Sequence, residues 1–232
     1  TDIIDTPDFY ERITGKILIK DLRPSWLIFS SGFRKTNTLR IIKRILDIFF
    51  SVIGLIVFSP ISFISAVIIK LDSRGPVFFT QTRVGEYGKP YTIYKFRSMT
   101  FGAEKEKGPT WAEVNDCRIT RFGRVIRRMR IDEVPQIINV LKGEMSFVGP
   151  RPEREFFINQ LQKRIPYYTQ RLMVKPGITG WSAVNAQYTS SIEAAVEKLQ
   201  YDLYYVKNMS IYLDLLIMLK TVKIILSGKG SR

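Results

Sequence analysis

Two adjacent carboxylates, Asp132 and Glu133, come directly after an arginine-rich stretch, residues 121–130, that reads RFGRVIRRMR. The simplest interpretation is structural, because surface carboxylates beside arginines commonly form weak ion pairs. A chemical interpretation is also open. An ionised aspartate can attack phosphorus without a general base, and a neighbouring carboxylate can hold Mg²⁺ together with substrate phosphates. In that interpretation Asp132 is the nucleophile and Glu133 is its partner at the metal site.

A third candidate lies downstream in GPRPE, residues 149–153, where Arg151 stands between two prolines. Prolines stiffen the backbone that presents the guanidinium group. Phosphoryl transfer concentrates negative charge on phosphate oxygens, and arginine binds such oxygens through paired hydrogen bonds. Arg151 is therefore predicted to bind a phosphate, with a structural ion pair as the alternative.

The arginines before the carboxylate pair recur at helical spacing, as Arg121, Arg124, Arg127 and Arg128. This spacing predicts a helix, which is either a solvated amphipathic helix or one that faces a phosphate. In the second case Arg124 is a candidate for substrate binding.

The residue inventory narrows the chemistry. The chain has no histidine, which excludes Ser-His-Asp and Cys-His mechanisms, a histidine base and a histidine metal site. Its single cysteine, Cys117, excludes an internal disulfide and a cysteine zinc cluster and is typical of a reducing compartment. The formal net charge of +15 favours anionic partners, such as phosphorylated substrates, anionic lipid or nucleic acid.

Residues 45–71 are almost entirely apolar, with only Asp47 and Lys70 charged, and this is long enough to cross a bilayer. Ser59 and Pro60 interrupt the middle, where proline removes a backbone donor and the serine hydroxyl can bind a freed carbonyl. Basic residues flank both sides, so a straight span would place one basic flank outside. We therefore predict a helix-break-helix hairpin that re-enters one leaflet. A straight span and a buried core helix are the alternatives.

The remaining segments predict short elements. Residues 77–84 and 91–99 form a β-hairpin around Gly85 and Gly88, and helices begin near Ser191 and Ser210. The last of these helices lies either in a membrane interface or in the core. The predicted fold class is α+β and mainly helical, with a re-entrant membrane hairpin, a small β-hairpin and interfacial amphipathic helices.

Residues 1–38 carry scattered prolines and glycines without a clear period, which predicts a linker or the tail of a preceding module. Residues 39–232 are predicted to be one membrane-associated catalytic domain. Because the chain starts at Thr1 rather than at methionine, we expect it to be part of a longer protein.

Five motifs in this order resemble a known family, the bacterial sugar transferases, or monotopic phosphoglycosyl transferases. They read KRILDIFFSVIGLIVFSP, GPVFFTQTRVG, YKFRSM, IDEVPQIINVLKGEMSFVGPRPE and KPGITGWSAVN. The resemblance runs from about Arg40 to the C-terminus, and residues 1–38 resemble the segment before the catalytic domain in longer exopolysaccharide-type members. It implies transfer of a sugar-1-phosphate from a UDP-sugar to polyprenyl (undecaprenyl) phosphate with release of UMP, by a ping-pong mechanism. It also implies a location in one leaflet at the cytoplasmic face of the bacterial inner membrane.

The resemblance assigns roles to individual residues. It implies that Asp132 forms a phosphosugar-aspartyl intermediate, that Glu133 is its partner at a Mg²⁺ site, and that Arg151 binds phosphate. Ser59 and Pro60 match the helix break. The remaining matches are by position: Lys95, Arg97 and Gln136 as substrate-binding candidates, and Lys43, Arg44 and Asp47 as membrane anchors.

Two other functions stay open at this stage. One is direct sequential transfer in which Asp132 and Glu133 only bind Mg²⁺. The other is a membrane-docked scaffold without enzymatic activity, which binds anionic lipid or nucleic acid through the net charge. With these motifs we expect UDP-sugar, undecaprenyl phosphate and membrane lipid as partners and no nucleic acid, and a homodimer remains open.

Overall fold

The computed structural model describes residues 6–19, 32–33, 35–102, 116–186 and 191–227. Its helices and strands, with short 3₁₀ turns labelled η, are α1 (Thr6–Thr14), α3 (Asn37–Asp72), β1 (Phe78–Val84), η1 (Glu86–Gly88), β2 (Pro90–Phe96), α4 (Arg121–Arg128), η2 (Ile131–Glu133), α5 (Gln136–Lys142), β3 (Ser146–Val148), α6 (Glu155–Leu161), η3 (Tyr168–Met173), β4 (Gly177–Thr179), α7 (Trp181–Asn185), α8 (Ile192–Asn208) and α9 (Ile211–Leu226). The predicted fold class, α+β and mainly helical, is confirmed.

The strands form two small sheets. β1 and β2 pair antiparallel as the predicted hairpin, with Val84 opposite Pro90 at the turn. β3 and β4 pair in parallel, a pairing that was not predicted from the sequence.

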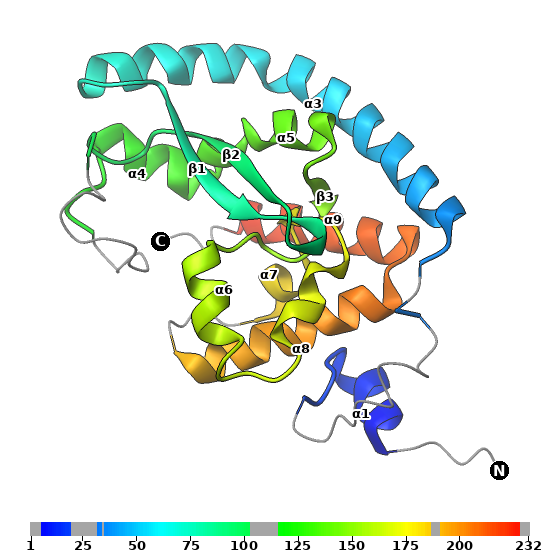
Figure 1. Cartoon of the computed structure of the whole chain (residues 1–232). Helices are drawn as coiled ribbons and strands as arrows, with labels where there is room; N and C mark the ends of the chain where they lie inside the picture. Colours follow the sequence, from blue (N-terminus) through cyan, green and yellow to red (C-terminus); the bar gives the residue numbers. More distant parts are fainter. Residues whose placement is uncertain (1–5, 20–31, 34, 103–115, 187–190, 228–232) are drawn as a thin grey trace.

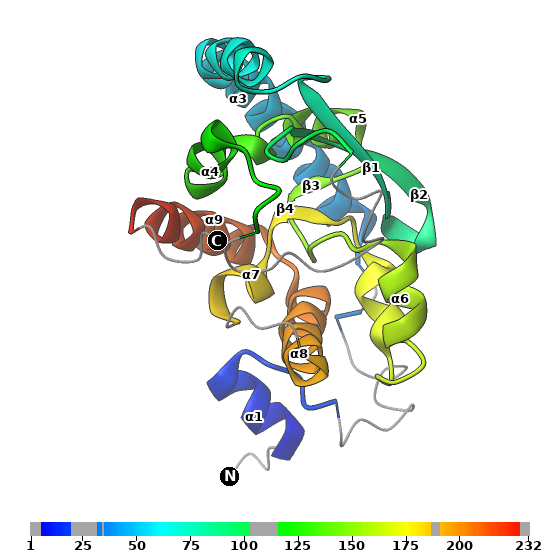
Figure 2. The same cartoon turned by 90° about the vertical axis from the view of Figure 1, so that its left-hand side faces the viewer.

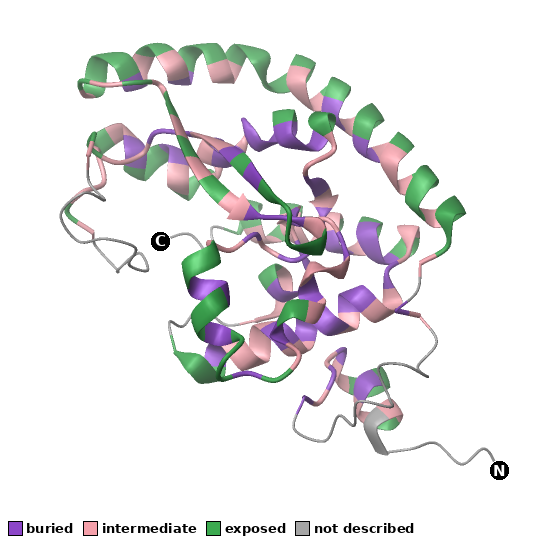
Figure 3. Ribbon diagram, viewed as in Figure 1, coloured by how far each residue is buried: buried purple, intermediate pink, exposed green. Residues whose placement is uncertain are grey.

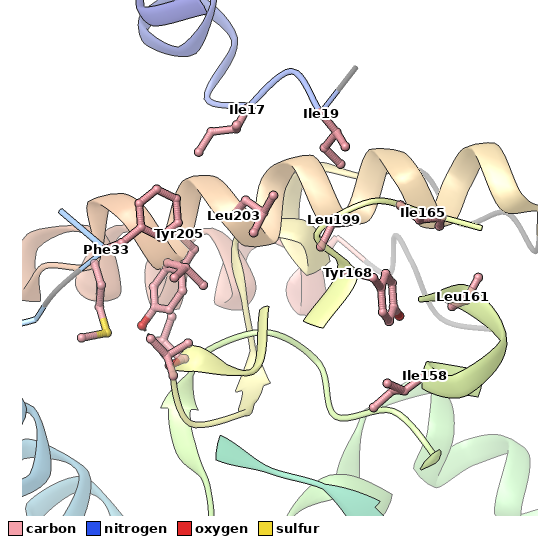
Figure 4. Close-up of a cluster of buried hydrophobic side chains, with 14 of the residues drawn as sticks. Ile17, Ile19, Phe33, Ile158, Leu161, Ile165, Tyr168, Leu199, Leu203 and Tyr205 are labelled. Atoms are coloured by element: carbon pink, nitrogen blue, oxygen red, sulfur yellow. Dashed lines mark hydrogen bonds between the residues drawn. The ribbon is translucent and has the colours of Figure 1, made fainter. Parts of the chain in front are cut away.

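The largest buried cluster surrounds α8, where Leu199, Leu203 and Tyr205 are almost fully buried (Figure 4). The long helix α3 arches over this body, at the opposite end of the molecule from α1 (Figures 1 and 2).

Helix α3 continues without interruption through Ser59 and Pro60. Proline cannot donate to the carbonyl four residues earlier, which here belongs to Ile56. The Ser59 hydroxyl donates to that same carbonyl at 2.8 Å, so the freed acceptor is satisfied and the helix curves rather than ends (Figure 1). The predicted break into two helices is therefore corrected to one long, curved helix.

Helix α3 buries mainly polar residues and exposes apolar ones, which is the opposite of a helix in a soluble protein. Its buried residues are Asp47, Ser51, Ser65 and Ile69, whereas its outer side is largely exposed (Figure 3). The exposed residues include many isoleucines, valines and phenylalanines. The helix is long and apolar enough to cross a membrane. Exposure of this size contradicts the alternative of a buried core helix and is typical of a lipid-facing surface.

Both halves of α3 are bonded to the body. In the first half, Lys43 lies 2.5 Å from Asp214 on α9, and Arg44 donates to the carbonyls of Val140 and Leu141 at the end of α5. Asp47 accepts hydrogen bonds from the Ser146 hydroxyl and the Phe147 amide of β3. The three residues predicted as membrane anchors thus point inward and join the helix to the body.

The second half of α3 is held by Arg97, which was predicted to bind substrate. The guanidinium group donates to the carbonyls of Ile69, Ser73 and Arg74. The Ile69 carbonyl belongs to the last turn of α3 and also accepts from the Ser73 amide, whereas the Ser73 and Arg74 carbonyls lie just beyond the helix. Arg97 therefore caps α3 and ties it to β2.

Replacing Asp47 by alanine is expected to destabilise the protein, because the Ser146 hydroxyl and the Phe147 amide lose their buried acceptor. The expected loss is about 2 kcal/mol, or a melting temperature lower by about 4–8 °C. Thermal unfolding in detergent measures it. Asp72→Ala is the matched control on the same helix, because Asp72 is exposed and, among the described residues, accepts only one long hydrogen bond, 3.3 Å from the Phe122 amide. Equal melting temperatures for the two variants would contradict the assigned role.

The described part of residues 1–38 packs against the body. Ile17 and Ile19 enter the α8 cluster (Figure 4), and the Gly15 carbonyl accepts from the Trp181 indole at 2.8 Å. Glu11 accepts from both Lys207 and Asn208 at the end of α8. A preceding module stays a prediction, but these residues extend the same core.

Candidate active site

The carboxylate pair lies in the 3₁₀ turn η2, between α4 and α5. Arg130, which begins the turn, has a φ of 55°, a left-handed conformation that costs a non-glycine residue about 1 kcal/mol. Ile131 anchors the turn in a cluster with Phe96 of β2 and Ile69 of α3. The position of the pair is thus coupled by packing to the end of α3.

Glu133 is buried and lies among three cations. Its Oε1 atom accepts from Arg151 at 2.8 Å and from Lys95 at 3.1 Å, and its Oε2 atom lies 3.7 Å from Arg130. Burial opposes ionisation, but these cations hold the pKa of the Glu133 carboxyl well below its ordinary value. Glu133 is therefore a fixed anion that gathers cations from strand β2, from the start of its own turn and from the loop after β3.

The surroundings of the Asp132 carboxylate differ from those of Glu133. It is half-buried, and within the described part of the chain its carboxylate makes no hydrogen bond or ion pair. Burial, and next the charge of Glu133, raise the pKa of the Asp132 carboxyl to about 6. At pH 7 the group is still mostly ionised, so it offers free lone pairs to an electrophile or a cation.

The pair opens into a cavity of about 860 Å³. Among the described residues its lining contains ten arginines and lysines against four aspartates and glutamates, which favours an anionic ligand. Phe58, two residues before the proline of α3, forms part of the wall and is also exposed on the outer apolar surface. The cavity thus extends from a cationic region to the lipid-like face of the protein.

The structure brings most of the predicted site residues together. Lys95 and Arg151 contact Glu133 directly, and Gln136, at the start of α5, is buried and lines the same cavity. Arg97 also reaches the wall, but its guanidinium group is bonded to the end of α3.

The arginines of α4 and of the start of η2 that reach the cavity differ from the one predicted. Arg124 is exposed and is not part of the cavity lining, whereas Arg127 and Arg130 line the cavity beside Asp132. The Arg127 Nη1 atom is buried, and no described residue accepts a hydrogen bond from it. A buried donor without a partner is costly, and it lies where an anion would satisfy it.

Few side chains at this site could be ligands of a metal ion. Among the described residues no group of three or more histidine, cysteine, aspartate or glutamate side chains could hold an ion. Asp132 has free oxygens facing the cavity, while both oxygens of Glu133 are occupied by cations. The arrangement fits Mg²⁺ at Asp132 with ligand phosphates, and fits it poorly at Glu133.

Comparisons with known proteins agree on one family. The family model described as bacterial sugar transferase matches residues 38–228. Over 96% of this chain, 44% of residues are identical to a UDP-N-acetylgalactosamine-undecaprenyl-phosphate N-acetylgalactosaminephosphotransferase of Aeromonas hydrophila, of which 52% is covered. A putative undecaprenyl-phosphate N-acetylgalactosaminyl 1-phosphate transferase of Bacillus subtilis is 51% identical over 60% of this chain and 76% of its own length.

A third relative, the UDP-glucose:undecaprenyl-phosphate glucose-1-phosphate transferase of Escherichia coli, is 42% identical over 79% of this chain and 40% of its own length. The chain therefore spans about half of the Aeromonas relative and less than half of the Escherichia relative.

Proposed function

Because this chain belongs to the bacterial sugar transferase family, we propose that it transfers a sugar-1-phosphate from a UDP-sugar to undecaprenyl phosphate and releases UMP. This is a membrane step early in polysaccharide or glycoconjugate assembly. The observation that carries the proposal is the free Asp132 carboxylate in a cationic cavity, beside a Glu133 that gathers three cations. The names of the relatives, all undecaprenyl-phosphate transferases, support the acceptor.

The proposed chemistry has two displacements at one phosphorus atom. First, an Asp132 oxygen attacks the β-phosphorus of the UDP-sugar, and the bond from that phosphorus to the bridging oxygen breaks, so that UMP leaves. Then a phosphate oxygen of undecaprenyl phosphate attacks the same phosphorus and breaks its bond to Asp132, which regenerates the carboxylate. Neither step transfers a proton, which is consistent with a chain that lacks histidine.

The cations around the pair stabilise charge on the diphosphate. Lys95 and Arg151 are held by Glu133, so they keep their positions when no substrate is bound. Such preorganised donors stabilise developing charge without reorganisation during the reaction. Arg127 adds a buried Nη1 donor for which no described residue is an acceptor, and an incoming anion would satisfy it.

Replacing Arg127 by glutamine is expected to lower kcat/KM for the UDP-sugar by about 10- to 100-fold, the usual range for losing a hydrogen bond to a charged group. Arg124→Gln is the matched control on the same helix, three residues away and exposed, and it is expected to stay within about twofold of wild type. Steady-state UMP release measures both variants. An equal loss in the two would mean that α4 contributes only its overall charge.

We further propose that Mg²⁺ binds at Asp132, with substrate phosphates as its other ligands. The cation would neutralise negative charge on the diphosphate. This revises the sequence prediction, which assigned Mg²⁺ to both carboxylates, because Glu133 is already surrounded by cations.

For membrane association we propose that α3 enters one leaflet from the cytoplasmic side and does not cross the bilayer. Two observations support this topology. The outer side of α3 is apolar, and both of its halves are bonded to the same body, through Asp47 and through Arg97. A helix with both ends on one body cannot place those ends on opposite sides of a bilayer. Basic flanks also favour the cytoplasmic face.

Accessibility of tags tests the topology. Tags placed before residue 1 and after residue 232 are expected to react with a membrane-impermeant reagent only after the inner membrane is opened. A reagent that reaches one tag in intact spheroplasts would establish a full span instead.

The function is tested by UMP release from purified protein with undecaprenyl phosphate and a panel of UDP-sugars. The panel includes UDP-N-acetylgalactosamine and UDP-glucose, the sugars in the names of the relatives. Exchange of labelled UMP into UDP-sugar without lipid acceptor is expected, since only the covalent route allows it. Product formation without exchange would favour direct sequential transfer, and absence of UMP release with every sugar would contradict the proposal.

A further inference from the structure

A buried ion pair lies at the wall of the cavity, apart from the carboxylate pair. Arg171 of η3 and Asp202 of α8 are 6% and 1% exposed, and their Nη2 and Oδ2 atoms are 2.8 Å apart. The Ser182 hydroxyl of α7 donates to the other Asp202 oxygen at 2.7 Å. Taking two charges out of water is expensive, and nothing in the proposed chemistry uses this pair.

The Arg171 guanidinium also contacts the segment that carries Arg151. Its Nη2 atom donates to the backbone carbonyl of Arg151 at 2.9 Å, and its Nη1 atom donates to the Tyr168 hydroxyl at 2.8 Å. The Arg151 side chain extends to Glu133 at 2.8 Å. Arg151 is thus held at its backbone by one buried ion and at its guanidinium by another.

Arg151 depends on these contacts because its own packing is loose. Its side chain is 40% exposed. Immediately before it, Gly149 and Pro150 are bonded to the backbone of β4. Beyond these hydrogen bonds, the contact of Arg171 with the Arg151 carbonyl fixes the direction in which the chain leaves the β3–β4 sheet. A displacement of about 1 Å at a catalytic group can cost about 100-fold in rate.

We propose that Arg171, held in place by Asp202, is a positioning residue that sets where Arg151 meets the substrate phosphate. The proposal rests on the proposed function of the Arg151 site. Arginine suits the role because its guanidinium group donates to the carbonyl and the hydroxyl while it forms an ion pair with the carboxylate. A lysine in its place keeps the charge beside Asp202 but cannot reach all three acceptors in this geometry.

A double-mutant cycle tests the proposal. Arg171→Lys is expected to lower kcat/KM for the UDP-sugar by about tenfold in the wild-type background and by less than about twofold in an Arg151→Ala background, since residues that act through one another are not additive. The same factor in both backgrounds, or no loss in wild type, would overturn it. Tyr168→Phe, which removes only the hydroxyl contact, is expected to follow the same pattern with a smaller loss and remains usable if Arg171→Lys folds poorly.

Arg44→Lys is the matched control, because Arg44 also donates to two backbone carbonyls but on α5, outside the cavity lining. Its effect is expected to be equal in both backgrounds. All assays are run below the melting temperature of every variant.

The affinity for UDP, measured by calorimetry in the same cycle, provides a readout without turnover. A wild-type protein that binds UDP but releases no UMP would contradict the proposed function, and the coupling in UDP affinity would then decide the positioning role alone.

Discussion

Asparagine in place of Asp132 is expected to lower UMP release by about 10⁴-fold or more, the scale seen when a catalytic nucleophile is removed. Asparagine keeps the shape of the side chain but is not a nucleophile toward phosphorus. The covalent mechanism also predicts a protein adduct. With UDP-sugar labelled at the β-phosphate and no lipid acceptor, wild-type protein is expected to become labelled and Asp132→Asn is expected to remain unlabelled.

Asp8→Asn is the control for this experiment, because Asp8 lies on α1, away from the cavity lining, with a side chain that is 47% exposed. It is expected to label and turn over as wild type does. Label that persists in Asp132→Asn would move the nucleophile to another residue. Loss of turnover with no label in either wild type or variant would favour direct transfer, with Asp132 acting only on the metal.

Local signals in the sequence predicted the elements that surround the site. The β-hairpin, the arginine helix and the starts of α8 and α9 all follow from short-range patterns, and Ser191 and Ser210 do cap their helices. Helical spacing also identified the arginines of α4, but it did not say which of them face the cavity. That choice depends on Ile126, which is fully buried against α3 and β2 and sets the rotation of the helix.

Contacts between distant segments could not be read from the sequence. The β3–β4 sheet joins strands of three residues each, too short to leave a periodic pattern. Gly149 and Gly177 permit the pairing, because a Cβ at either position would lie within 2.5 Å of the opposing backbone. The contacts of Ile17 with α8 and of Asp47 with β3 likewise join residues far apart in the chain. Asp47, a polar residue in an apolar helix, was predicted from the sequence to be a membrane anchor. Its hydrogen bonds with Ser146 and Phe147 instead connect α3 to the body.

Glu133 has two candidate roles, organising the neighbouring cations or binding Mg²⁺, and its replacement by glutamine distinguishes them. Glutamine keeps the size of the side chain but removes the negative charge. Lys95, Arg130 and Arg151 then lose the negative charge that they share. Because their side chains are only partly buried, we expect them to move apart and toward solvent. We expect kcat/KM to fall by about 100-fold, comparable to the loss of one preorganised charge-stabilising group.

The dependence on Mg²⁺ distinguishes the roles. If Glu133 only organises the cations, the Mg²⁺ concentration for half-maximal activity stays within about threefold of wild type. If it binds the metal, that concentration rises by tenfold or more, since a charged ligand is lost. Glu197→Gln is the control, because Glu197 forms an ion pair with Lys16 outside the cavity lining, and it should change neither value beyond about twofold. A large shift in the Mg²⁺ requirement of Glu133→Gln alone would restore the two-carboxylate metal site that the sequence predicted.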